Sequence, residues 1–82
     1  MKVGPVVAED DSWWCQVICN SGHLWTIRVR IVTVAGVDVY ECWVNDMMLP
    51  VFRPRDPEND ESELDWIFNV ALHYVKGEVG CC

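Results

Sequence analysis

The chain has 82 residues, of which 51% are apolar and five are tryptophan. This is enough for one small domain with a real core, and it excludes an intrinsically disordered chain. Thirteen acidic residues against six basic ones give a net charge of −7. Such a charge repels phosphate backbones, so we expect no direct nucleic-acid binding and a basic protein surface as the natural partner. A charge that serves solubility alone is the alternative.

The N-terminus lacks the pattern of a signal peptide, and the longest apolar-rich run, residues 31–37, is far shorter than the ~20 residues that span a bilayer. We therefore expect a cytoplasmic protein without membrane contact. Five cysteines are present, namely Cys15, Cys19, Cys42, Cys81 and Cys82. An odd number of cysteines in that compartment predicts reduced thiols.

The first part of the chain predicts an antiparallel meander. Residues 3–8 form a short edge strand or arm, because Pro5 cannot donate to a strand ladder. Residues 13–19 predict a strand whose two faces are both largely apolar, so its inward face stays open. Residues 23–34 predict the cleanest strand, since apolar and polar residues alternate with period two. The apolar set is Trp25, Ile27, Val29 and Ile31.

Residues 37–44 predict the return strand, after a turn at Ala35-Gly36. A last short strand over residues 47–52 follows the turn at Asn45-Asp46 and contains Pro50, which favours an edge position. Connections of two or three residues require antiparallel neighbours. The sheet therefore covers residues 3–52, with four to five strands.

Residues 53–60 predict an acidic loop, and residues 61–76 predict the only clear amphipathic helix. Two helix starts compete. Asp56 could cap with Pro57 at the first helical position, or Asp60 could cap with Glu63 completing a capping box. We favour Asp60, because the apolar periodicity begins only at Leu64. The apolar stripe is Leu64, Ile67, Phe68, Ala71, Leu72 and Val75.

This stripe predicts that the helix packs on one face of the sheet. A loose tail is expected over residues 77–82. The fold class is therefore α+β, with an antiparallel β-meander and one C-terminal helix in a single domain over residues 1–82.

Six carboxylates lie within ten residues at the start of this helix. We call residues 56–65 the acidic segment; its carboxylates are Asp56, Glu58, Asp60, Glu61, Glu63 and Asp65. One or two acids suffice to interact with the positive end of a helix dipole. The others form a negative surface that could occupy a Lys/Arg groove which a partner uses for phosphates. A merely solvated face is the alternative.

Trp66 points nearly opposite the apolar stripe on a helical wheel. An exposed tryptophan beside carboxylates is typical of an interface anchor, so we predict that Trp66 contacts the partner. The alternative is that the N-terminal arm folds over this face and buries Trp66 within the domain.

Neither metal binding nor catalysis is predicted. Cys15, Cys19 and His23 recur every four residues, but on an extended strand the two cysteines lie about 13 Å apart, too far to share one ion. No Gly-rich phosphate loop, nucleophile motif or metalloprotease motif occurs. We expect no cofactor, no metal and no enzyme activity.

In size, acidity and lack of catalytic motifs, the chain resembles the small inhibitors that phages make against host defence nucleases. It is similar in the same way to immunity proteins that neutralise nuclease toxins. The resemblance lies in composition and implies a protein-binding inhibitor, of anti-CRISPR or anti-restriction type, that blocks a nucleic-acid-binding surface by negative-charge mimicry in the host cytoplasm. The alternatives are an immunity protein, or a structural subunit or homodimer that pairs through its sheet edge or through residues 13–19.

Overall fold

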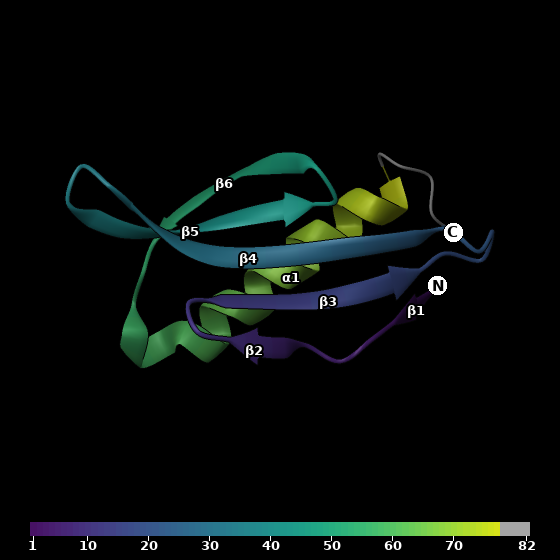
Figure 1. The fold of residues 1–82 in the computed structure, drawn as a ribbon, viewed down its shortest axis with the longest axis horizontal. Helices are drawn as coiled ribbons and strands as arrows, with labels where there is room; N and C mark the ends of the chain where they lie inside the picture. The colour runs from purple at the N-terminus through teal and green to yellow at the C-terminus, as the bar shows by residue number, and fades with distance from the viewer. Residues whose placement is uncertain (78–82) are drawn as a thin grey trace.

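A computed structural model describes residues 1–77 as a sheet followed by one helix (Figure 1). The elements are β1 (Lys2–Val3), β2 (Val7–Glu9), β3 (Ser12–Ile18), β4 (Leu24–Val34), β5 (Val37–Val44), β6 (Met47–Pro54), the 3-10 helix η1 (Pro57–Asn59) and α1 (Asp60–Gly77). The prediction of an α+β fold with an antiparallel sheet and a C-terminal helix is confirmed. The predicted tail lies outside the described residues, apart from Gly77, which ends α1.

The strand order is β1-β3-β4-β5-β6, with β2 also paired to β3, and all neighbours are antiparallel. β1 and β2 share one edge of β3, so the predicted first strand is broken in two by residues 4–6. The backbone N–H of Gly4 donates to the carbonyl of Gln16 at 2.7 Å and holds the arm against β3. A Cβ at Gly4 would lie 3.2 Å from that oxygen, so glycine suits the close approach.

Three of the turns use residues with positive φ, and Gly22, with φ of 89°, lies in the turn between β3 and β4. Ala35 and Gly36 have φ of 52° and 78° between β4 and β5, as the favoured two-residue hairpin turn requires. Asn45 has φ of 50° between β5 and β6. Its side-chain Oδ1 accepts a hydrogen bond from the backbone N–H of Thr26, and its own N–H donates to the Thr26 carbonyl, both at 2.8 Å. Asn45 therefore ties this turn to the start of β4.

The core lies between α1 and one face of the sheet. Its buried members are Cys15, Val17, Cys19, Ile27, Val29, Tyr40, Cys42, Val44 and Leu49 from the sheet side, and Leu64, Ile67, Phe68, Ala71 and Val75 from α1. Leu72 packs against this core while half-buried, so the predicted helix stripe is confirmed. The ambiguous strand turns Trp13, Cys15 and Val17 toward the helix, because Cys15 pairs with Ile27 in register.

Cys15 and Cys42 are free, buried thiols. Burial raises the pKa of both, and it raises that of Cys42 to about 12. Both therefore act as small core residues rather than nucleophiles. The expectation of reduced thiols is confirmed for these two and is wrong for Cys19, which is disulfide-bonded, because pairing depends on which thiols the fold brings together. Cys81 and Cys82 lie outside the described residues.

The predicted helix, residues 61–76, agrees with α1 to within one residue, but the predicted cap at Asp60 is wrong. Asp60 has helical dihedrals (φ −50°, ψ −44°) and lies inside the helical segment rather than at its cap. Asp56 has extended dihedrals and caps η1, with Pro57 at the first helical position, and η1 runs directly into α1. Among the described residues, no helix is long and apolar enough to cross a membrane.

Ile67→Ala should lower the free energy of unfolding by about 2–5 kcal/mol, because Ile67 is fully buried between α1 and the sheet and truncation leaves a cavity. Urea denaturation followed by tryptophan fluorescence measures the change. Asn69→Ala, at an exposed position of the same helix, is the control and should change stability by less than about 0.5 kcal/mol. Equal effects of the two variants would contradict this packing of α1.

Candidate protein-binding site

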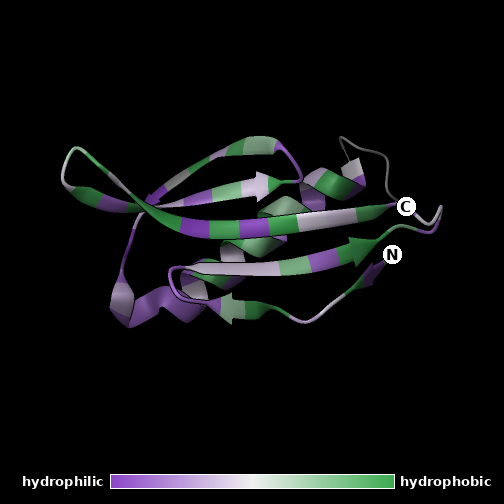
Figure 2. Cartoon of the chain, in the orientation of Figure 1, coloured by the Kyte–Doolittle hydropathy of each residue, from purple (hydrophilic) through white to green (hydrophobic). Residues whose placement is uncertain are grey.

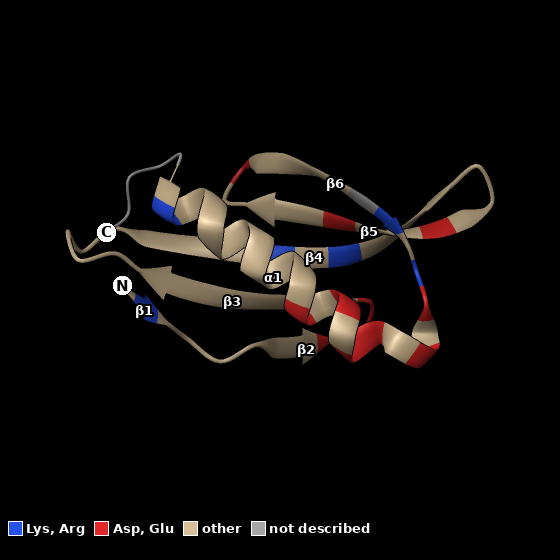
Figure 3. Ribbon diagram, turned by 180° about the vertical axis from the view of Figure 1, so that it is seen from behind, with Lys and Arg blue, Asp and Glu red and all other residues tan. Residues whose placement is uncertain are grey.

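The six carboxylates of the acidic segment gather on η1 and the first turns of α1 (Figure 3). They divide into two groups of three. Asp56, Asp60 and Glu63 form contacts within the chain. Glu58, Glu61 and Asp65 are exposed, and their side chains have no hydrogen-bond or ion-pair partner among residues 1–77.

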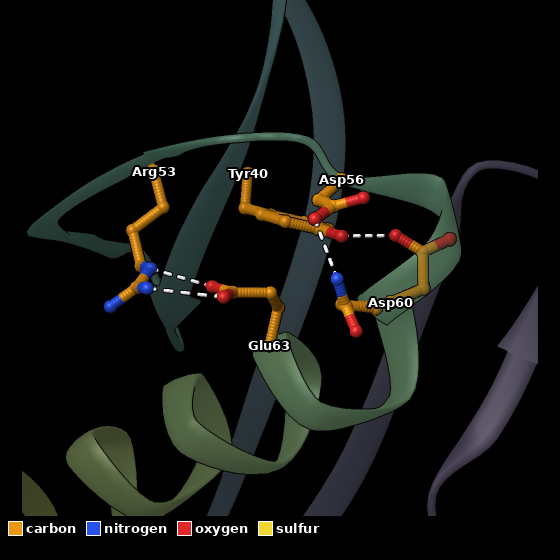
Figure 4. A network of polar contacts seen from close by, with 6 residues as sticks. Tyr40, Arg53, Asp56, Asp60 and Glu63 are labelled. Atoms are coloured by element: carbon orange, nitrogen blue, oxygen red, sulfur yellow. Dashed lines mark hydrogen bonds and ion pairs between the residues drawn. The ribbon is translucent and has the colours of Figure 1, made fainter.

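Asp60 joins the start of α1 to the sheet (Figure 4). Its carboxylate accepts a hydrogen bond from the hydroxyl of Tyr40 on β5 and lies 3.2 Å from Nη2 of Arg55. The Tyr40 hydrogen bond, followed by the contact with Arg55, lowers the pKa of Asp60. Burial, followed by the hydrogen bond to Asp60, raises the pKa of Tyr40 to about 12. These contacts explain why Asp60 is not free to cap the helix.

Glu63 joins α1 to β6 in the same way (Figure 4). Arg53 Nε lies 2.6 Å from Glu63 Oε2, and Arg53 Nη2 lies 3.1 Å from Oε1, which makes a two-pronged ion pair. The same guanidinium lies 4.5 Å from the centre of the Trp66 ring, in a cation–π contact. Glu63 therefore acts as an anchor and does not complete a capping box.

Asp56 satisfies the N-terminus of η1. Its carboxylate accepts hydrogen bonds from the backbone N–H of Glu58 at 3.2 Å and from the side-chain amide of Asn59 at 2.7 Å. This carboxylate is thus explained by local capping. Three of the six carboxylates predicted to bind the partner therefore make contacts within the fold.

Trp66 remains 46% exposed. The N-terminal arm pairs with β3 instead of covering this residue, so the alternative in which the arm buries Trp66 is wrong. The ring is flanked by Arg53 on the β6 side of α1. Whether a partner contacts Trp66 stays a prediction.

A groove of about 850 Å³ lies between the first turns of α1 and the N-terminal arm. Its apolar lining consists of Val6, Trp13, Leu64 and Phe68. Its polar lining comes from α1 and consists of Asp60, Glu61, Ser62 and Asp65. Since Glu61 and Asp65 are exposed while Leu64 and Phe68 are buried, the groove has an apolar floor and an acidic rim.

This arrangement suits a lysine or arginine side chain from a partner. The aliphatic part of such a side chain can cover the apolar floor while its cation meets the carboxylates. The structure thus brings the predicted site residues Glu61 and Asp65 together with Val6 and Trp13. The sequence did not indicate Val6 or Trp13 as site residues. Val6 offered no signal, because its position depends on how the arm lies. Trp13 belonged to the strand whose inward face was ambiguous.

No group of three His, Cys, Asp or Glu residues within residues 1–77 is placed to hold a metal ion. Cys15 and Cys19 both lie in the core, where they pack against apolar side chains. No protein-family model, no curated protein and no solved structure matches this chain. The function therefore has to be argued from the geometry of the site.

Tyr40→Phe should lower the free energy of unfolding by about 1–3 kcal/mol at pH 7, because the Asp60 carboxylate loses its hydroxyl donor. The substitution should also reduce the loss of stability, measured as the free energy of unfolding, that occurs as the pH rises above neutral. Tyr40 has a raised pKa of about 12 in the folded state, whereas an unfolded tyrosine titrates near ~10. The unfolded chain therefore releases this proton first, and stability falls as the pH rises through this range.

Urea midpoints measured from neutral to alkaline pH test this expectation. Tyr74→Phe is the matched control, because it leaves Tyr40 in place and should keep the alkaline loss. If the loss of stability at alkaline pH is the same in Tyr40→Phe as in the wild type, Tyr40 does not cause that loss.

On the acid side, the lowered pKa of Asp60 has the opposite consequence. The stability that the Asp60 carboxylate contributes is present above the ordinary Asp range and is lost as the pH falls through the pKa of Asp60 in the folded state.

Proposed function

We propose that this protein is a small acidic inhibitor that binds the basic surface of another protein, a surface which that partner uses to bind nucleic-acid phosphates. The observation that carries the proposal is the acidic-rimmed groove. Its two exposed carboxylates, Glu61 and Asp65, have no partner among the described residues and stand beside an apolar floor.

Folding does not account for this pair of carboxylates. Glu61 and Asp65 are four residues apart on α1, and like charges at that spacing destabilise a helix by about 0.2–0.5 kcal/mol. Asp65 also lies beyond the first turn, where the favourable interaction with the helix dipole has faded. A partner with lysine or arginine side chains would relieve the repulsion and gain charge complementarity.

The groove is held in shape before any partner binds. Asp60 ties the first turn of α1 to β5 through Tyr40, and Glu63 ties it to β6 through Arg53. Glu61, which lies between these anchors, and Asp65, two residues after Glu63, are therefore presented on a fixed helical surface. A fixed surface loses less conformational entropy on binding, which supports a binding role.

The more specific assignment, a phage anti-defence protein of anti-CRISPR or anti-restriction type in the host cytoplasm, rests on composition alone and stays a prediction. An immunity protein that neutralises a nuclease toxin would use the same geometry. Both assignments require a partner with a basic functional surface and no catalysis by this chain.

Glu61→Lys and Asp65→Lys should each weaken the complex with the partner by about ten-fold or more, because each reverses a charge at the rim. The partner is first captured from a lysate of the source cell on immobilised protein and eluted with salt. Its affinity is then measured by calorimetry, together with its ability to bind a labelled DNA or RNA duplex. The wild-type protein should displace the duplex, and the two reversed variants should not.

Asp46→Lys is the matched control, since Asp46 is an exposed carboxylate in the β5–β6 turn and its reversal changes the net charge equally. It should bind and displace like the wild type. Equal weakening by all three reversals would mean that net charge alone drives association. Unchanged binding by Glu61→Lys and Asp65→Lys would overturn the groove as the site.

Trp66→Ala tests whether the contact extends across the outward side of α1. Interface tryptophans often account for about 2 kcal/mol or more of binding energy, so we expect about a thirty-fold loss of affinity. Calorimetry with the captured partner measures the change, and circular dichroism checks the fold. Unchanged affinity would confine the contact to the groove side of the helix.

A further inference from the structure

The sheet has a second face that α1 does not cover, which we call the open face; Figure 1 looks onto it. Its residues alternate with the core residues along each strand. They include Val7, Trp14, Ile18, Leu24, Arg28, Arg30, Val32, Val34, Val37, Val39, Glu41, Trp43 and Met48. Nothing in residues 1–77 packs over this face.

The open face carries many of the exposed apolar residues of the described chain. Ten large apolar residues of the described chain are exposed, and six of them lie on this face: Val7, Ile18, Leu24, Val34, Val37 and Met48. Trp14, Arg28, Trp43 and Met48 form one row across β3, β4, β5 and β6. The exposed apolar residues gather at the two ends of the face, Ile18 and Leu24 at one end and Val34 and Val37 at the other, and exposed apolar clusters mark interaction sites.

The β4–β5 hairpin lengthens this surface beyond the rest of the sheet, and apolar residues dominate its tip (Figure 2). Val34 pairs with Val37 and Val32 pairs with Val39, all on the open side. At the two-stranded tip, Val34 and Val37 have no core beneath them, and their cross-strand pairing contributes only about 0.2–1 kcal/mol. They are explained if another surface covers them.

The charges on this face nearly balance, because three cations, Lys2, Arg28 and Arg30, stand against two carboxylates, Glu9 and Glu41. Arg30 pairs with Glu41 at 2.7 Å, and Glu41 also accepts a hydrogen bond from Trp43 Nε1 at 2.5 Å. Glu9 accepts a hydrogen bond from Trp14 Nε1 at 2.8 Å, and Arg28 remains as a cation. Two copies of a chain with net charge −7 would repel each other through their acidic segments, but not through this face.

We propose that the open face packs against the open face of a second copy of this chain. The two sheets would lie about 10 Å apart, as in a β-sandwich. The sheet lies in the plane of the two longest dimensions, 42 and 22 Å, so the face covers up to roughly 900 Å², similar to the ~800 Å² per partner of a standard interface.

A twofold arrangement of this kind places the helices on the two outer sides. Each copy then presents its acidic-rimmed groove outward, and the dimer carries two identical grooves. The inference does not depend on the proposed function, because the groove and the open face lie on opposite sides of the sheet.

Sedimentation velocity of the full chain, over a hundred-fold range of micromolar concentrations, tests the proposal. The wild type should be a dimer whose stability is little changed by high salt, because the contact is apolar. Leu24→Lys and Val34→Lys introduce like charges at opposite ends of β4, at positions that are 52% and 55% exposed. Each should weaken dimerisation at least ten-fold without disturbing the fold, which circular dichroism checks.

Val3→Lys is the matched control, because Val3 is 49% exposed but lies on the helix-covered side of the sheet edge, opposite Val17. It should dimerise like the wild type. A monomer at all concentrations would overturn the proposal and leave the face to a different protein. A dimer that both β4 variants leave unchanged, or one that high salt dissociates, would place the contact elsewhere and overturn it as well.

Discussion

One α-helix has to cover a sheet that is too wide for it. A helix with its side chains is about 10 Å across, whereas five strands about 4.8 Å apart form a sheet roughly 20 Å wide. α1 crosses one face at an angle, from the β2 side at its start to the turn between β5 and β6 at its end (Figure 3). The sheet beside it remains uncovered, and the groove over Trp13 and the flank with Arg53 follow from that mismatch. The opposite face has no cover at all among the described residues.

Polar contacts decide where this helix begins. Asp60 and Glu63 each find an arginine on the segment that leads out of the sheet, and Asp60 also meets the buried hydroxyl of Tyr40. These partners offset two of the negative charges and fix the first turn at the same time. The remaining repulsion falls on Glu61 and Asp65, which have no such partners in residues 1–77. The division between anchoring and exposed carboxylates thus comes from the strands beneath the helix and not from the helix itself.

The groove beside α1 and the open face of the sheet differ in charge and in apolar content. The groove beside α1 combines a small apolar floor with exposed carboxylates that have no partner within residues 1–77, which suits a different, basic protein. The open face combines apolar residues at both of its ends with nearly balanced charge, which suits a second copy of the same face. Because they lie on opposite sides of the sheet, occupation of one does not obstruct the other. A dimer would present two grooves to a partner, and a repeated binding surface can raise avidity without any new contact.

The sequence alone determined the strands, the hairpin turns and the buried stripe of the helix, because each of these follows from a local pattern. Around Ile27 and Val29 the residues on one face of the strand are apolar and those on the other face are polar, so the pattern specifies which face is buried. The strand at residues 13–19 is apolar on both sides, and only its register against β4 decided that Cys15 faces the core. Tertiary structure also decided three other features: the helix start, the separation of Trp66 from the groove and the position of Val6 in the groove. For the face of residues 13–19 and for Val6, the deciding partner lies far away in the chain, where pattern and spacing cannot position it. For the helix start, Tyr40 on β5 binds Asp60, and the local cap at Asp56 takes its place.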